Sequence, residues 1–191
     1  LTSAIITCTL TTRLKDHAKM SAQAAFRTKV LFDTNQLLQR AKSEEEIFSL
    51  TASQLIKLLN RSLIVYPEQN GDLGSEQFFG VDGETAQNIF SAPEERDAAN
   101  WTFANKKRSG AGTDSYPDAK GLYLALRTGG GVFGVVGIDL SEKPLDAFEN
   151  SVLLSILGEG ALAIENRRNA LEKEQAALQA RNEELSLIHI S

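Results

Sequence analysis

Cysteine is almost absent from this 191-residue chain, in which Cys8 is the single residue of that type. One thiol excludes an internal disulfide and any zinc site built from cysteines. Histidine is scarce too, with two residues, and the potential metal ligands do not cluster in the sequence. We therefore expect no metal ion or other cofactor, and a reducing compartment.

An excess of positive charge is also lacking. The chain carries 25 acidic and 20 basic side chains, a net charge of −5, whereas nucleic-acid binders usually have a basic surplus. Hydrophobic residues make up 42% and charged residues 24%, which is typical of a folded domain. We see no nucleophile paired with a base, so we expect neither a nucleic-acid partner nor a catalytic residue in this chain.

Charge is missing altogether from residues 1–12, LTSAIITCTLTT. At about 1.5 Å per residue this segment cannot cross a bilayer core of about 30 Å. Arg13, Lys15 and Lys19 follow, and basic residues just past a membrane helix mark the cytoplasmic side. We predict that residues 1–12 end a transmembrane helix of a longer protein, since the sequence begins at Leu1. The start of an ordinary buried helix is the alternative.

Two helices are predicted next. Apolar residues recur near a 3.5-residue spacing at Met20, Ala24, Leu31, Leu38 and Ala41, which predicts a linker helix over 13–42 with one face for a partner helix. Ser43-Glu44-Glu45-Glu46 is a capping box that begins a second helix ending near Asn60.

Strands should follow, because the apolar pattern changes to short runs bounded by turn residues. Residues 62–66, 76–81, 122–127 and 132–139 are the candidates, and Thr128 to Gly131 predicts a hairpin. A capping box at Ser91 predicts a helix from Pro93 to about Lys107. The fold class is therefore α+β, an antiparallel sheet with flanking helices, and we place the domain at residues 43–158.

The last predicted helix runs from about residue 144 to 187, and over 159–186 it has the pattern of a coiled coil. Its companion positions Ala161, Arg168, Gln175 and Asn182 are mostly polar, which favours a weak or switchable contact. A solvated helix lying on its own domain is the alternative. We predict a dimer interface formed by apolar residues of the two terminal helices: Leu31, Leu38, Ile164, Leu171, Leu178 and Leu185.

One cluster could bind a small anionic ligand. Three cations stand beside a glycine-rich loop whose free N–H groups could receive a phosphate. The candidate site comprises Trp101, Lys106, Lys107, Arg108, Gly112, Thr113 and Asp114. Alternatively, the basic residues only end a helix, where they favour its dipole, and Trp101 lies in the core. Gly129 to Gly131 lacks the Lys-Ser/Thr of a phosphate loop and is assigned to the hairpin turn.

His189 does not fit a kinase phosphoacceptor. Its neighbours are Leu187-Ile188 and Ile190-Ser191, and no carboxylate, arginine or proline follows it. Because this tail breaks the polar heptad pattern, residues 187–191 are a candidate for a non-native tail.

Four segments together carry a family resemblance: Trp101-Thr102-Phe103-Ala104-Asn105-Lys106, Gly110-Ala111-Gly112-Thr113-Asp114-Ser115-Tyr116-Pro117, Leu122-Tyr123-Leu124-Ala125-Leu126 and Gly134-Val135-Val136-Gly137. They resemble the GAF domain of KdpD-type osmosensitive potassium sensor kinases, with Ser115 replacing a threonine. The resemblance implies four transmembrane helices upstream, and a phosphoacceptor helix pair and an ATP-binding domain downstream.

The function this implies is a sensor and signal-relay module at the cytoplasmic face of the bacterial inner membrane, with self-association through the terminal helices. A response regulator would be reached through the missing kinase core. The alternative is a GAF module that mainly binds a small molecule such as a cyclic nucleotide. The chain itself is expected not to be an enzyme.

Overall fold

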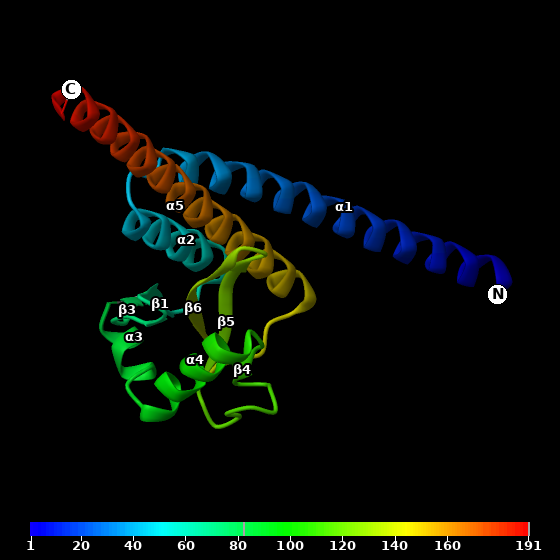
Figure 1. Ribbon diagram of the computed structural model, residues 1–191. Helices are drawn as coiled ribbons and strands as arrows, with labels where there is room; N and C mark the ends of the chain where they lie inside the picture. The colour runs from blue at the N-terminus through cyan, green and yellow to red at the C-terminus, as the bar shows by residue number, and fades with distance from the viewer. Residues whose placement is uncertain (82, 191) are drawn as a thin grey trace.

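A six-stranded antiparallel sheet separates two groups of helices in the computed structural model, which describes residues 1–81 and 83–190 (Figure 1). The strand order is β2-β1-β6-β5-β4, and β3 pairs with the same edge of β1 as β2. The strands are β1 (Leu63–Gln69), β2 (Asp72–Leu73), β3 (Gln77–Phe79), β4 (Ser109–Gly110), β5 (Gly121–Thr128) and β6 (Gly131–Asp139).

The helices cover both faces of this sheet (Figure 1). One face carries the second helix, the first half of the last helix and the end of the first helix; the other carries the two short helices between β3 and β4. The helices are α1 (Thr2–Arg40), α2 (Glu44–Leu59), α3 (Gly83–Ile89), α4 (Pro93–Asn105) and α5 (Ala147–Ile190).

Strand β1 shows why the central strands are apolar without alternation. Leu63 and Val65 belong to the core cluster under α2 and α5, whereas Ile64 and Tyr66 belong to the cluster under α4. Successive side chains of a strand point to opposite faces, so a strand covered on both sides must be apolar throughout. The predicted central strands and their hairpin are confirmed by the pairing of β5 with β6.

The core extends beyond the predicted domain limits of 43–158. Leu38 of α1 and Ala161 and Ile164 of α5 all lie in the main core cluster. Helix α1 runs without a break from Thr2 to Arg40, across the predicted boundary between residues 1–12 and 13–42, and residues 187–190 continue α5; Ser191 lies outside the described residues. The two terminal helices are therefore parts of the domain as well as extensions of it.

Within the described residues, α5 is also the one helix that is long and apolar enough to cross a membrane, with an 18-residue window of mean hydropathy 1.3. In the first half of the helix, Leu153 and Ile156 are fully buried against the sheet and α2. Burial in the core accounts for part of this apolar character, since 39% of the window is buried.

Capping residues were predicted correctly at one helix and wrongly at another. The Glu46 N–H donates to Ser43 Oγ over 3.1 Å, so Ser43 is confirmed as the N-cap of α2. The Glu46 carboxylate accepts from the Lys42 N–H over 2.6 Å, one residue before the N–H that a complete capping box uses. The capping box at Ser91 is wrong, because α4 begins after Ala92 and the Ser91 hydroxyl donates to the Asn88 carbonyl at the end of α3. Helix α3, which was not predicted, ends there.

A buried carboxylate connects α4 to the sheet. Glu95 is 1% exposed, and it accepts hydrogen bonds from the N–H groups of Lys120 and Gly121 over 2.6 and 3.1 Å. The Tyr123 hydroxyl donates to the same carboxylate over 2.6 Å. Burial raises the pKa of Tyr123, and the Glu95 charge beside it adds to that rise. Three donors thus satisfy a group that would otherwise be costly to bury.

We predict that Glu95→Ala lowers the free energy of unfolding by about 3 kcal/mol, because it leaves several buried donors unpaired. Tyr123→Phe removes one donor and leaves the carboxylate two partners, so its effect should be less than half as large. Urea denaturation of both variants measures this. A loss below about 1 kcal/mol for Glu95→Ala would show that the network does not hold α4 in place.

Candidate functional site

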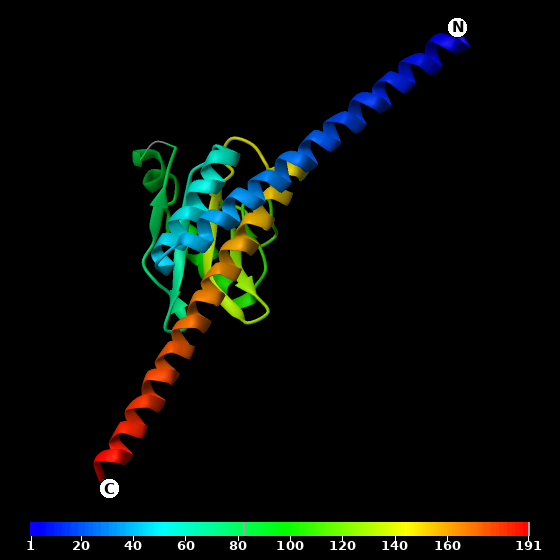
Figure 2. The ribbon, with the colours of Figure 1, turned by 90° about the horizontal axis from the view of Figure 1, so that it is seen from above.

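Helices α1 and α5 run parallel and side by side at the centre of the molecule, then leave it in opposite directions (Figure 2). Two hydrogen bonds connect them. Arg27 Nη1 donates to Ser151 Oγ over 2.8 Å, and Asn35 Nδ2 donates to Glu159 Oε2 over 2.8 Å. Each pair is separated by 124 residues, so both bonds belong to a single parallel register.

Apolar side chains complete this contact. Thr34 and Leu38 of α1 are buried, and Val30 and Leu31 pack against the same core. From Val30 onward, the apolar stripe predicted over residues 13–42 therefore packs against α5 and α2 of the same chain, whereas Met20 and Ala24 at its start are exposed.

Two residues of the predicted dimer interface must be corrected. Leu38 is 4% exposed and Ile164 is 0% exposed, so neither can contact a second chain directly. Leu31 is half-buried against the core. Leu171, Leu178 and Leu185 are exposed on the part of α5 beyond the domain, and their role in a dimer stays a prediction.

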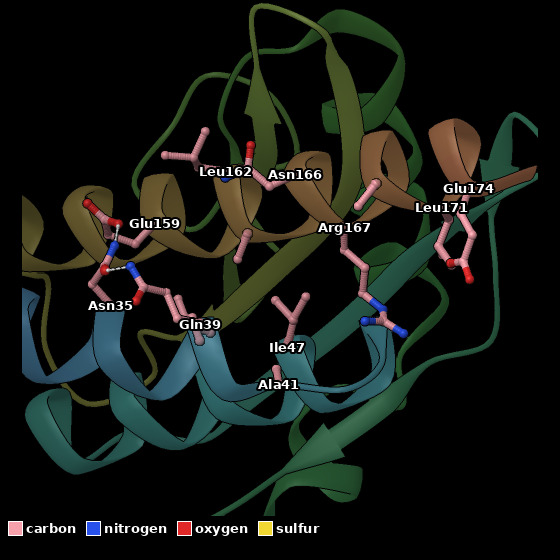
Figure 3. A pocket seen from close by; sticks show the side chains of 13 residues that line it. Asn35, Gln39, Ala41, Ile47, Glu159, Leu162, Asn166, Arg167, Leu171 and Glu174 are labelled. Atoms are coloured by element: carbon pink, nitrogen blue, oxygen red, sulfur yellow. Dashed lines mark hydrogen bonds between the residues drawn. The ribbon is translucent and has the colours of Figure 1, made fainter. Parts of the chain in front are cut away.

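A groove with a volume of about 470 Å³ lies where α1 and α5 meet (Figure 3). Gln39 Nε2 donates to Asn35 Oδ1 over 2.7 Å, and Asn35 in turn donates to Glu159, so polar side chains form a chain across the groove. Leu162 and Leu171 lie along its α5 side. This groove marks the end of α1, beyond which α5 continues alone.

A salt-bridge cluster fixes α5 where it leaves the domain. The guanidinium group of Arg168 contacts Glu44 at 2.8 and 3.0 Å and Glu68 at 2.7 Å, and it lies 5.3 Å from the ring centroid of Phe133. Arg168 thus joins α5 to the start of α2, to β1 and to β6. We call Arg168, Glu44 and Glu68 the exit clamp.

The exit clamp shifts the pKa values of Arg168 and Glu68. The hydrogen bond to Glu44 is the largest influence on the pKa of Arg168, which rises above its ordinary value. Burial acts to raise the pKa of Glu68, but hydrogen bonds from the Gly71 N–H and from Arg168 outweigh it, so this pKa lies below its ordinary value of 4.5. Both shifts favour the charged pair at neutral pH.

The heptad pattern did not indicate this role of Arg168, which occupies a polar position of the predicted coiled coil. Ala161 and Ile164 are buried on the face that continues to Arg168 four residues later. Two features of the sequence could have indicated this role: a basic residue at the end of the apolar stripe of α5, and acidic residues at the start of α2.

The structure does not bring the predicted anion-binding residues together. Arg108, Gly112 and Thr113 line a hollow of about 340 Å³, which Trp101, Lys106, Lys107 and Asp114 do not line. The N–H groups of Gly110, Ala111 and Thr113 donate to carbonyl groups within or beside the loop, so the assumption that they were free is wrong. Lys106 ends α4 in the left-handed conformation, with φ of 58°.

A second hollow, with a volume of about 470 Å³, lies between β1 and the junction of α3 and α4. Its cation, Arg96, donates to the carbonyls of Leu73 and Gly74 over 2.8 and 3.0 Å and pairs with Glu76. The guanidinium group also lies 4.9 Å from the ring centroid of Tyr66. A phosphate entering this hollow would have to compete with Glu76 for the cation.

No group of three or more histidine, cysteine or acidic side chains is placed to hold a metal ion in the described ranges 1–81 and 83–190. The polar groups assembled at the α1–α5 contact and the exit clamp hold helices together.

No protein-family model matches the sequence. The sensor protein KdpD of Clostridium acetobutylicum is 28% identical over 183 residues, which is 95% of this chain, and the chain spans about a fifth of that relative, 20% of its length.

Solved structures share the fold. The GAF domain of the potassium sensor histidine kinase KdpD from Escherichia coli is 21% identical with a TM-score of 0.53, over 79% of this chain and 99% of that one. The GAF domain of a putative sensor histidine kinase from Pseudomonas syringae pv. tomato is 19% identical with a TM-score of 0.54, over 83% and 97%. The chain therefore has the GAF fold, and it resembles the GAF domain of KdpD sensor kinases.

Proposed function

We propose that this chain is a signal-relay and dimerisation segment of a membrane-bound, KdpD-like sensor histidine kinase. In this proposal residues 1–12 are the end of a membrane-spanning helix, and the domain lies at the cytoplasmic face of the bacterial inner membrane. The kinase core, which would pass phosphate to a response regulator, lies outside the chain. The observation that carries the proposal is the parallel contact between α1 and α5.

A displacement of α1 would reach α5 directly. The helices share a buried apolar contact through Leu38 and two hydrogen bonds in one register, at Ser151 and Glu159. Packed interfaces tend to occupy discrete arrangements and transmit strain. Rotation or translation of α1 would therefore move α5 without passing through the sheet.

Through the exit clamp, the sheet and α2 can also act on the part of α5 that leaves the domain. Arg168 binds residues of α2 and β1 and lies against Phe133 of β6. Beyond it α5 is exposed on all sides to Ile190. A change in the sheet that loosens the exit clamp would free the start of this extension, so the domain could bias the direction in which α5 leaves.

A cyclic nucleotide is less well supported as the input. The loop predicted to bind its phosphate uses three N–H groups internally, and Arg96 in the other hollow is already paired with Glu76. An anionic ligand would have to replace existing contacts at either place. We therefore propose relay rather than nucleotide binding as the main task.

The relay is tested by grafting residues 1–190 in place of the GAF domain of Escherichia coli KdpD. Autophosphorylation is then measured at low and high potassium. In this chimera, Asn35→Asp places a carboxylate against Glu159, and we expect the ratio between the two conditions to fall at least fivefold while basal activity is kept. Gln36→Glu, an exposed neighbour with the same change of charge, should leave the ratio unchanged.

Two outcomes would contradict the proposal. One is an unmodified chimera whose autophosphorylation does not respond to potassium. The other is an Asn35→Asp chimera that responds as strongly as the unmodified one, since the α1–α5 contact would then have no part in transmission.

The exit clamp predicts a pH dependence of stability. Because the pKa of Glu68 is lowered in the folded state, its contribution is complete above the unfolded value of 4.5 and is lost as the pH falls through the folded value. Glu68→Gln should cost about 1 kcal/mol of unfolding free energy at pH 7, and this cost should shrink below pH of about 4.

Chemical denaturation of both proteins between neutral and acidic pH measures that difference. Glu45→Gln, which removes an exposed carboxylate nearby, serves as the control and should change stability by less than about 0.5 kcal/mol. A cost for Glu68→Gln that stays constant down to low pH would contradict the lowered pKa.

A further inference from the structure

Two arginines from different helices hold the hairpin of β1 and β2. Arg168 of α5 donates to Glu68 on β1 over 2.7 Å. Arg96 of α4 donates to the carbonyls of Leu73 and Gly74, at the end of β2, over 2.8 and 3.0 Å. Helices α4 and α5 pack on opposite faces of the sheet, so this hairpin is held from both faces (Figure 1).

The turn of this hairpin is short and internally bonded. Asn70 and Gly71 form a two-residue connection with φ of 55° and 91°, which is the backbone of a tight hairpin turn. The Gly71 N–H donates to Glu68 Oε1, and the Gly74 N–H donates to the Pro67 carbonyl, each over 2.7 Å. We call the segment from Pro67 to Gly74 the edge hairpin. Because these bonds close it at both ends, it can move as one body.

Glu68 is the residue at which the two arginine contacts meet. Its Oε1 accepts from the turn, its Oε2 accepts from Arg168, and its Cα is paired with that of Leu73 across the hairpin. The carbonyl of Leu73 is one of the two that accept from Arg96. Arg96 and the exit clamp are therefore connected through a single cross-strand residue pair.

Arg96 is suited to hold the edge hairpin in one position. A guanidinium group is planar and presents its donors in a fixed fork, so two neighbouring carbonyls and Glu76 together define its orientation. The ring of Tyr66 lies against the same group, with its centroid 4.9 Å away. Since β2 is a strand of two residues, the bonds from Arg96 fix an element that backbone pairing alone would hold weakly.

We propose that Arg96 positions Glu68 through the edge hairpin and so sets how firmly the exit clamp holds α5. Withdrawal of Arg96 from its two carbonyls would free the edge hairpin on the side of α4, and Glu68 would move with it. Arg168 would then keep only Glu44 as an ion-pair partner, and α5 would leave the domain over a wider range of directions. A change in the hollow that Arg96 lines would thus reach a helix on the other face of the sheet.

The proposal rests on the proposed function in one respect, because it takes the exposed part of α5 as the output. It adds an input that does not pass through α1. The hydrogen bonds of Arg96 go to the end of β2 and to Glu76, whereas α1 donates to α5 at Ser151 and Glu159. The two inputs can therefore be altered separately.

The test measures how firmly α5 is held where it leaves the domain. Spin labels at the exposed positions 53 and 175 of a Cys8→Ser protein report the distance between α2 and the part of α5 beyond the exit clamp. Dilution with unlabelled chain restricts pulsed electron resonance to single molecules. We expect Arg96→Met to widen the distance distribution by about half or more, and Arg127→Met, which removes an exposed arginine of β5, to leave it unchanged.

Circular dichroism confirms that both variants are folded. If Arg96→Met does not fold, Arg96→Lys takes its place with the same expectation, because an ammonium group keeps the charge but lacks the fork that holds two carbonyls.

A double variant separates positioning from a general loosening of the domain. Glu68→Ala removes the carboxylate from the exit clamp and should widen the distribution at least as much as Arg96→Met. If Arg96 acts through Glu68, adding Arg96→Met to Glu68→Ala should widen the distribution no further.

Three results would overturn the inference. If Glu68→Ala widens the distribution and Arg96→Met does not, the edge hairpin carries no effect, while the exit clamp of the proposed function stands. If the double variant is wider than either single variant, Arg96 stabilises the domain without acting through Glu68. If neither single variant changes the distribution, the exit clamp itself does not fix α5, and the relay through α1 is still tested separately by Asn35→Asp.

Discussion

The structure depends on the parallel packing of its first and last helices against a shared core. Leu38 of α1 and Ile164 of α5 are buried in one apolar cluster with the sheet and α2, so neither helix can move far without disturbing the fold. A long helix in water gains most of its stability from such packing and little from its own sequence. The GAF domain is thus built around the two elements that leave it.

The environment of helix α5 differs along its length. Up to Ile164 one face is core, and from Leu171 on it is exposed, with Arg168 between the two parts. The position of Arg168 matters because its partners come from α2 and β1, which belong to different layers of the domain. In the proposed KdpD-like sensor kinase, this arrangement of α5 would serve to transmit a conformational change from the membrane part to the catalytic part.

The sequence predicted the sheet, the β5–β6 hairpin and the Ser43 cap, because these features depend on local patterns of two to four residues. It did not identify the partners of its amphipathic helices. The stripe at Leu31 and Leu38 predicts a helix contact equally well within one chain or between two, and only tertiary structure decides. The seven-residue repeat from Ile164 to Leu185 likewise continued from a core helix into an exposed one without a break.

The central claim is that α1 packs against α5 of its own chain in one register. Spin labels at positions 27 and 151 of a Cys8→Ser protein, diluted with unlabelled chain, report the distance within single molecules by pulsed electron resonance. The account predicts one short, narrow distance distribution that dilution does not change. A long or broad distribution, or a short distance that vanishes on dilution, would contradict it, because α1 would then be detached or paired with α5 of another chain.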